Sequence, residues 1–470
     1  MISIRAKDFF WSYIASFLNM GINVLILPFV LAFLDDASLG IWYVFASINT
    51  LVMLLDFGFT PTIARNIAYA WSGAGMLAAT GVQADEIEDE PKAKVFYNVV
   101  ATCKAIYLLL SIIAILLLFV AGSGYVLAVS PDDMKAGFLA AWLVYAAGVL
   151  CNLYFSYASA CLRGVGAIAE NAKAQTYAKI VQLAFTAILL AGGAGIMGTS
   201  VAYLASCLVM RVSMTWYFNR FDGVRELLEG AKRKFELAPI VAMAKTIWHN
   251  AWRDGLVSFS MFCSLQANTL ICSYVLGLSS TGSYGLVIQI ATAVTSVASV
   301  SYSTIQPKLQ ELALRGDKEA SLGLFAGSVS MFFAIDVVAS VAFLLVGPAL
   351  ISLFGKTLDM SATMMAVILI YMCLYKANTL FISCISNYNE VPYALAYAVT
   401  GVASVVASAA MAQFTSAWLW SLIIPPLVVL CCYNLWKWPT VALEKLGASY
   451  RAFAAACLAG LKQKIAAGRR

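Results

Sequence analysis

The stretch FYNVVATCKAIYLLLSIIAILLLFV, from Phe96 to Val120, carries a single charge, at Lys104, in an otherwise mostly apolar sequence. A hydrocarbon core of about 30 Å is crossed by a helix of roughly 20 apolar residues, so this stretch can span a membrane. Backbone hydrogen bonding inside lipid requires such a segment to be helical. The 470 residues as a whole are 62% hydrophobic and 11% charged, with a mean hydropathy of +0.85. We therefore expect an integral membrane protein.

Similar stretches recur along the chain and predict an all-α membrane bundle of about twelve helices. The predicted spans are Phe9 to Leu34, Leu39 to Ile63, Phe96 to Val120, Gly137 to Cys161, Thr176 to Gly193, Gly198 to Phe218, Gly255 to Leu276, Gly282 to Ile305, Leu322 to Val346, Met360 to Cys384, Val391 to Phe414 and Trp418 to Trp436. The short glycine-rich segment from Gly192 to Gly195 indicates a tight hairpin between the fifth and sixth spans. The first span is too long for a removable signal peptide and lacks a small-residue cleavage site, so we expect it to remain as a helix.

Basic residues are concentrated in every second gap between the spans, beginning with the amino-terminal segment. Of the 30 Lys and Arg residues, only Lys135 and Lys356 lie in the opposite gaps. The positive-inside rule therefore predicts that both termini are cytoplasmic. The net charge of +6 is then a mark of topology rather than of nucleic acid binding.

Groups that could perform catalysis or bind a metal are scarce. His249 is the single histidine, which excludes a histidine-based metal cluster or proton relay. The eleven cysteines are scattered and form no CxxC pair, so we interpret them as small packing residues. We expect no enzymatic activity, no metal site and no cofactor, with a coupling proton or Na⁺ left open.

An internal repeat divides the chain into two halves. Aligning the segment that begins at Ser12 with the one that begins at Val257 pairs Asn23 with Asn268, among other identities. Six helices per half preserve orientation, which predicts two six-helix lobes related by a pseudo-two-fold axis along the membrane normal, with substrate bound between them. The predicted organisation is an N-lobe at 1–220, a cytoplasmic linker at 221–253, a C-lobe at 254–438 and a basic amphipathic cytoplasmic tail at 439–470.

Two segments carry a resemblance to a known family. They are LILPFVLAFLDDASLGIWYV, from Leu25 to Val44, and LLDFGFTPTIARNIAYAWSG, from Leu54 to Gly73; the second half contains the related LICSYVLGLSSTGSYGL, from Leu270 to Leu286. The chain resembles Wzx-type polysaccharide or O-antigen flippases of the multidrug/oligosaccharidyl-lipid/polysaccharide exporter superfamily.

The resemblance implies a V-shaped two-lobe fold in the bacterial cytoplasmic (inner) membrane. It also implies that undecaprenyl-diphosphate-linked oligosaccharide moves from the cytoplasmic to the periplasmic leaflet by alternating access. The expected partners are this substrate, membrane lipids, and the polymerase and glycosyltransferases of the same pathway. One chain holds both lobes, which predicts a functional monomer.

Four basic residues lie inside the predicted spans, each toward the cytoplasmic end: Lys104, Lys179, Arg211 and Lys376. Charges inside a membrane usually face a water-filled cavity or one another. We therefore take these residues as candidate ligands for the diphosphate and glycan. A lysine one or two turns deep can instead extend its ammonium group to the lipid headgroups, and this alternative stays open for Lys104 and Lys179.

Asp336 lies near the middle of its span, beyond reach of the headgroups, and is a candidate carrier of a coupling proton or cation. The alternative is an ion pair with Lys376. Asp56 and Arg65 are further candidates for coupling or charge pairing, and for Asp56 we favour pairing with one of the intramembrane cations.

Asn23 and Asn268 are weaker candidates for contacts with sugar hydroxyl groups, because hydrogen bonds between helices explain them equally well.

Three other functions compete with this interpretation. A cation-coupled multidrug or metabolite exporter of the same superfamily would favour an acidic and aromatic lining, such as Asp336, Tyr371 and Tyr375. A lipid II flippase is a narrower version of the main hypothesis. A membrane glycosyltransferase or polymerase would usually need a large periplasmic loop or a soluble catalytic domain, and the longest predicted periplasmic gap, Ala121 to Ala136, is too short for one.

Overall fold

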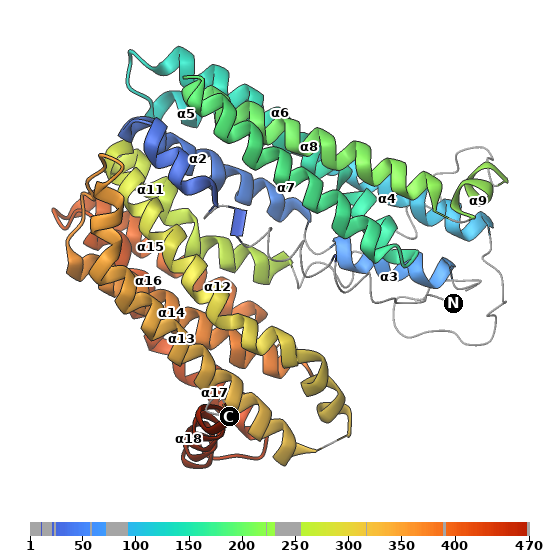
Figure 1. Ribbon diagram of the computed structural model, residues 1–470, viewed down its shortest axis with the longest axis vertical. Coiled ribbons are helices and arrows are strands. Elements are labelled where there is room, and N and C mark those ends of the chain that lie inside the picture. Colours follow the sequence, from blue (N-terminus) through green and yellow to red (C-terminus); the bar gives the residue numbers. More distant parts are fainter. Residues whose placement is uncertain are drawn as a thin grey trace. The chain divides into compact units, whose positions relative to one another are not determined.

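The computed structural model describes residues 11, 21–22, 25–56, 59–71, 93–221, 223–230, 255–315, 317–388 and 392–467 (Figure 1). Within these ranges, eleven helices are long and apolar enough to cross a membrane. Half of the first predicted span, Phe9 to Leu34, lies outside the described residues. The chain is a multi-pass, all-α membrane protein, as predicted.

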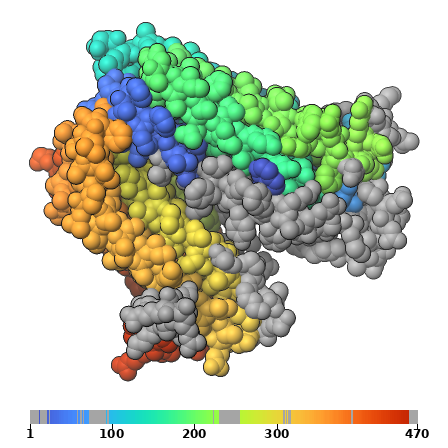
Figure 2. All heavy atoms as spheres, viewed as in Figure 1, coloured from blue at the N-terminus to red at the C-terminus, as the bar shows by residue number. Residues whose placement is uncertain are grey.

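The chain forms two compact units, Met1–Phe259 and Ser260–Arg470. Unit 1 contains ten described elements: α2 Asp36–Met53, η1 Leu54–Asp56, α3 Phe59–Trp71, α4 Ala93–Ile115, η3 Leu116–Gly122, α5 Ser123–Val129, α6 Lys135–Gly164, α7 Ile168–Ala191, α8 Gly195–Arg220 and α9 Val224–Gly230. Helix α6 is central to this unit, because it packs against α8, α3 and α4, while α8 also packs along α7. In the space-filling view, α7 and α8 form one continuous green face of unit 1 (Figure 2).

The hairpin predicted between the fifth and sixth spans is present. Helix α7 ends at Ala191 and α8 begins at Gly195. Gly193 and Gly195 have φ angles of +80° and +53°, which glycine adopts without the steric cost that other residues would meet. The tight turn therefore depends on these two glycines.

The second predicted span, Leu39 to Ile63, is not one helix. Helix α2 leads into η1, a 3₁₀ turn that ends at Asp56, and a separate helix, α3, begins at Phe59. Pro61 lies in the first turn of α3, where a proline fits because its missing N–H would have no partner within the helix. The regular α-helix of the second span therefore ends at Met53, ten residues before the predicted end at Ile63.

Helix α4 continues beyond the predicted end at Val120 through a π-helical turn, η3 Leu116–Gly122, into α5. The Trp142 indole of α6 donates a hydrogen bond to the Leu118 carbonyl at 3.2 Å. A Cβ atom at Gly122 would lie 2.5 Å from Cζ2 of Trp142, so the close approach requires glycine. Since α5 ends at Val129 and α6 begins at Lys135, the connection is shorter than the predicted gap from Ala121 to Ala136.

Unit 2 begins within a membrane-length helical span, Gly255–Val275, whose second part is α11 Ala267–Val275. The remaining elements are α12 Leu278–Arg315, α13 Lys318–Ser352, α14 Ala362–Ser386, α15 Ala394–Phe414, α16 Trp420–Val429, η4 Leu430–Asn434, α17 Leu435–Lys445 and α18 Tyr450–Ala467. The last span was predicted to end at Trp436, but the helical path continues to Lys445 despite three prolines.

Helix α18 belongs to the predicted basic tail. It follows a turn at Gly447, which has a φ of +66°, and it packs against α13. The Phe453 ring lies 5.8 Å from the Phe325 ring of α13 and 5.6 Å from the Phe381 ring of α14. The Ser330 hydroxyl of α13 donates to the Cys457 carbonyl at 3.0 Å. Helix α18 therefore connects two membrane helices of unit 2.

Candidate functional site

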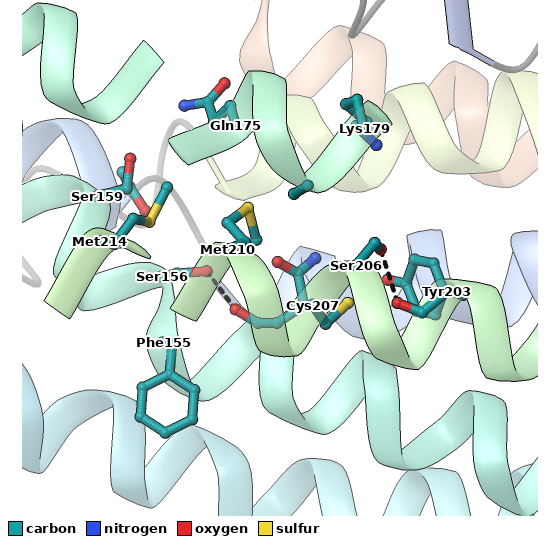
Figure 3. Close-up of a pocket in the computed structure, with 13 residues that line it drawn as sticks. Phe155, Ser156, Ser159, Gln175, Lys179, Tyr203, Ser206, Cys207, Met210 and Met214 are labelled. Atoms are coloured by element: carbon teal, nitrogen blue, oxygen red, sulfur yellow. Dashed lines mark hydrogen bonds between the residues drawn. The ribbon is translucent and has the colours of Figure 1, made fainter. Parts of the chain in front are cut away.

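Unit 1 contains a cavity of about 270 Å³ among α6, α7 and α8 (Figure 3). Residues of four helices line it: Thr60 of α3; Asn152, Phe155, Ser156 and Ser159 of α6; Gln175, Ala178 and Lys179 of α7; and Tyr203, Ser206, Cys207, Met210 and Met214 of α8. The lining positions lie toward the ends of α6, α7 and α8 that the positive-inside rule predicts to be cytoplasmic. The cavity is therefore in the part of unit 1 where the sequence predicts a substrate headgroup to arrive.

Lys179 carries the only charge among the residues that line this cavity. It is half-buried, and its Nζ donates to Oε1 of Gln182 at 3.4 Å. The Ser156 and Ser206 hydroxyls donate to the carbonyls of Asn152 and Tyr203, at 2.9 and 2.7 Å, so their oxygens can still accept hydrogen bonds. The cavity thus combines one ammonium group with neutral hydrogen-bonding groups.

Asp56 lies at the edge of this cavity, through Thr60. The Tyr107 hydroxyl of α4 donates a short hydrogen bond to Oδ1 of Asp56, and the Thr60 hydroxyl donates to the same atom at 3.1 Å. The Thr60 and Tyr107 hydroxyls are 2.7 Å apart. Among the side chains that the structure describes, these hydroxyls, and none of the four intramembrane cations, are the hydrogen-bond partners of Asp56.

Arg211 and Lys104 lie at a cluster of three aromatic rings on α6: Tyr154, Phe155 and Tyr157. The Arg211 guanidinium carbon of α8 is 3.4 Å from the centroid of the Phe155 ring, and Nζ of Lys104 of α4 is 5.7 Å from that of Tyr157. Within the cluster, the Tyr154 ring lies 4.4 Å from Phe155 and 5.7 Å from Tyr157. Aromatic faces attract cations, so the cluster holds both charges in place.

Phe155 connects these two features, because its ring contacts Arg211 and also lines the cavity. In Figure 3 the ring lies on the opposite side of the cavity from Gln175 and Lys179. Three of the four intramembrane cations predicted from the sequence, Lys104, Lys179 and Arg211, therefore gather around one region of unit 1.

Lys376 and Asp336 belong to unit 2, on α14 and α13. Asp336 is only 2% exposed, and its Oδ1 has no hydrogen-bond partner within the described part of the chain. Its neighbours are the hydroxyl of Ser340 and the thiol of Cys373. Lys376 is half-buried and, among the described residues, forms no ion pair with Asp336. The ion pair considered as an alternative is therefore not formed in this structure.

Asn268 connects two helices of unit 2. Its side-chain Nδ2 donates to the Leu422 carbonyl of α16 at 2.9 Å, and the residue is 2% exposed. The residue four positions after Leu422 is Pro426, which has no N–H, so the helix itself cannot supply a donor to that carbonyl. The amide therefore completes the hydrogen bonding of a proline-containing helix, which favours the structural interpretation of Asn268 over a sugar contact.

Asn23 and the side chain of Arg65 lie outside the described residues.

Several residues of the site were not singled out from the sequence. Asn152, Ser156 and Ser159 recur at helical spacing within an apolar span, and this polar stripe is a signal that could have revealed the cavity wall. Thr60 lies only four positions after Asp56 and could have been found from the sequence, whereas Tyr107, on α4, had no such signal.

Solved structures share this fold. An inward-facing multidrug resistance MATE family transporter of the MOP superfamily matches 91% of this chain and 94% of its own, with a TM-score of 0.67 and 15% identity. The chain has a MATE-like fold. The lipid II flippase MurJ, in an inward closed conformation, matches 96% of this chain and 91% of its own, with a TM-score of 0.64 and 10% identity.

An outward-facing MATE transporter matches with a TM-score of 0.53 and 16% identity, over 94% of this chain and 95% of its own. No protein-family model matches the sequence, and no curated protein does either. At these identities the likeness shows the fold, and the predicted all-α, two-lobe fold class is confirmed.

Proposed function

We propose that this protein is a flippase for lipid-linked oligosaccharides. It would move undecaprenyl-diphosphate-linked glycan units from the cytoplasmic to the periplasmic leaflet of the inner membrane by alternating access. The observation that carries the proposal is the gathering of Arg211, Lys104 and Lys179 around a cavity that is otherwise lined by neutral polar and apolar groups. Cations held at membrane depth on a helix bundle suit an anionic headgroup whose lipid tail stays in the bilayer.

The likeness to MurJ supports this proposal, because that protein is a flippase for a lipid-linked substrate. The fold is also compatible with lipid II as substrate. We favour the wider class of lipid-linked oligosaccharides because of the resemblance of the segment from Leu54 to Gly73 to Wzx-type exporters.

Cell-surface glycan assembly provides the test. The double variant Arg211→Glu and Lys376→Glu replaces one cation in each unit with a carboxylate that repels a diphosphate. We expect export of lipid-linked repeats to fall at least tenfold while the protein still reaches the membrane. Lys135→Glu is the matched control, because Lys135 is the first residue of α6, away from the cavity, and pairs with Asp132 at 2.6 Å. Undiminished export by the double variant would refute the role of these cations.

A cation-coupled multidrug exporter is the second candidate, and unit 2 supplies the observation that favours it. Asp336 is buried with an oxygen that has no hydrogen-bond partner among the described groups, and the Tyr371 and Tyr375 rings on α14 lie 6.0 Å apart. A buried carboxyl group can pair with a cationic drug, and aromatic faces attract the same class of ligand. Uptake of fluorescent organic cations into inverted vesicles, with and without a proton gradient, separates this candidate from the flippase.

Asp336 also fits the coupling role in either function. A buried carboxyl group that pairs with no described cation suits a residue that takes up a proton or a cation during transport. Lys104 and Arg211 in unit 1 would then hold the substrate, and Asp336 in unit 2 would couple its movement to an ion gradient.

A further inference from the structure

Phe155 separates two chemically different surfaces of unit 1. One is the aromatic cluster that holds Arg211 and Lys104, and both of these side chains are exposed on the described surface. The other is the cavity, where Asn152 and Ser156 extend from the same helix as Phe155. A molecule bound at both surfaces would need an anionic group for the cations and, directly next to it, a neutral polar group for the cavity.

The surface at the aromatic cluster suits a diphosphate. Arg offers several N–H donors in a planar fork that matches phosphate oxygens, and Lys adds a second positive charge. Within the described residues, both cations contact aromatic rings and neither forms an ion pair with a carboxylate. An incoming dianion can therefore pair with them without first breaking a salt bridge.

The cavity suits a sugar ring. Hydroxyl and amide groups dominate its polar lining, with Asn152, Ser156 and Ser159 on one wall and Gln175 on another. Such groups exchange hydrogen bonds with the hydroxyls of a pyranose. A single ammonium group, at Lys179, cannot neutralise a diphosphate, but it can donate to the ring or substituent oxygens of a sugar. The volume of about 270 Å³ favours one monosaccharide over a longer glycan.

We infer that the cavity among α6, α7 and α8 is a monosaccharide subsite that takes the sugar attached directly to the diphosphate, while Arg211 and Lys104 take the diphosphate. Phe155 is the shared wall at the sugar–phosphate bond. This inference rests on the proposed flippase function, and it assigns the sugar and the diphosphate of the substrate to different residues. It predicts that the first sugar, and not only the charge, determines affinity.

Two soluble probes separate the two surfaces. Farnesyl diphosphate carries the lipid and the charge without a sugar, and farnesyl diphospho-N-acetylglucosamine adds one monosaccharide. Binding of each to the purified full-length chain in nanodiscs is measured by calorimetry. Since a hydrogen bond contributes roughly 0.5–1.5 kcal/mol, we expect the sugar-bearing probe to bind about tenfold more tightly to the wild type.

Three variants locate the effect. Asn152→Leu combined with Ser156→Ala should remove most of the tenfold preference while leaving the affinity for farnesyl diphosphate unchanged. Gln175→Leu, on a different helix, should also reduce the preference for the sugar-bearing probe. Agreement between the two variants would show that the effect of the first is not a folding defect. Arg211→Gln should weaken both probes. Ser303→Ala, an exposed serine of unit 2 that donates to its own helix, is the control and should change neither affinity.

The outcomes distinguish the two proposals. If the wild type binds both probes equally and the cavity variants change nothing, the monosaccharide subsite is refuted while the flippase proposal survives. If the wild type binds neither probe, the proposed function fails and the subsite fails with it.

Discussion

The hydroxyl groups around Asp56 allow a quantitative test of how the break in the second span is held. Tyr107 is fully buried, and its hydroxyl donates to Asp56 and lies 2.7 Å from that of Thr60. Tyr107→Phe removes this hydroxyl and little else. A hydrogen bond to a charged group contributes about 1.5–3 kcal/mol, whereas one between neutral groups contributes about 0.5–1.5 kcal/mol. The size of the loss therefore reports whether Asp56 is ionised.

The free energy of unfolding is measured for the wild type, Tyr107→Phe, Asp56→Ala and the double variant, by equilibrium unfolding in mixed micelles. We expect a coupling energy of about 1.5–3 kcal/mol if Asp56 is ionised. Repeating the Tyr107→Phe change in an Asp56→Asn background keeps the acceptor oxygen but removes the charge, and should reduce the loss to about 1 kcal/mol. A coupling energy below about 0.5 kcal/mol would be within ordinary additivity and would refute the structural role of this contact.

Three further variants test other contacts. Asn268→Leu leaves the Leu422 carbonyl without a donor and should lower the free energy of unfolding by about 1–2 kcal/mol. Adding Pro426→Ala restores a helical N–H and should recover part of this loss. If nothing is recovered, Pro426 is not the reason why the carbonyl needs Asn268. Asp336→Asn should be at least as stable as the wild type, because it removes a potential buried charge. The same variant should lose the acceleration of transport by a pH gradient. Acceleration that persists in the variant would exclude a coupling role for Asp336. Phe453→Ala loses two ring contacts worth about 0.5–1.5 kcal/mol each and should expose the carboxyl-terminal helix to limited proteolysis; an unchanged cleavage rate would show that α18 is not held there.

The sequence predicted those parts of the fold that depend on hydrophobicity alone. Helices α6 and α8 lie close to their predicted spans, because an uninterrupted apolar segment determines where a membrane helix runs. Helix α7 begins at Ile168, eight residues before the predicted start at Thr176. The split of the second span had a local signal in Pro61 that the apolar pattern concealed. The extension of α4 through η3 had none that hydropathy detects, because its flanking residues are equally apolar.

The sequence predicted which charged residues belong to the candidate site, but not which side chains they contact. Arg211 and Lys104 are unusual as charges within apolar spans, and the structure places both against aromatic rings of α6. Which ring each cation contacts depends on how far the helices are rotated about their axes, and the sequence does not encode that rotation locally. The same limit applies to Asn268, whose acceptor on α16 is distant in sequence.

The π-helical turn at Leu116–Gly122 affects how insertions and deletions would be tolerated. Such a turn accommodates one extra residue, and each residue of an α-helix advances the side-chain direction by about 100°. Deleting a single residue there should convert the turn to ordinary α-helix without rotating α4 relative to α5. The same deletion two turns earlier would rotate Lys104 away from the Tyr157 ring. A one-residue deletion in a relative of this protein is therefore tolerated most easily opposite Trp142. A helical wheel drawn continuously from α4 to α5 through this turn would assign the residues of one of the two helices to the wrong face.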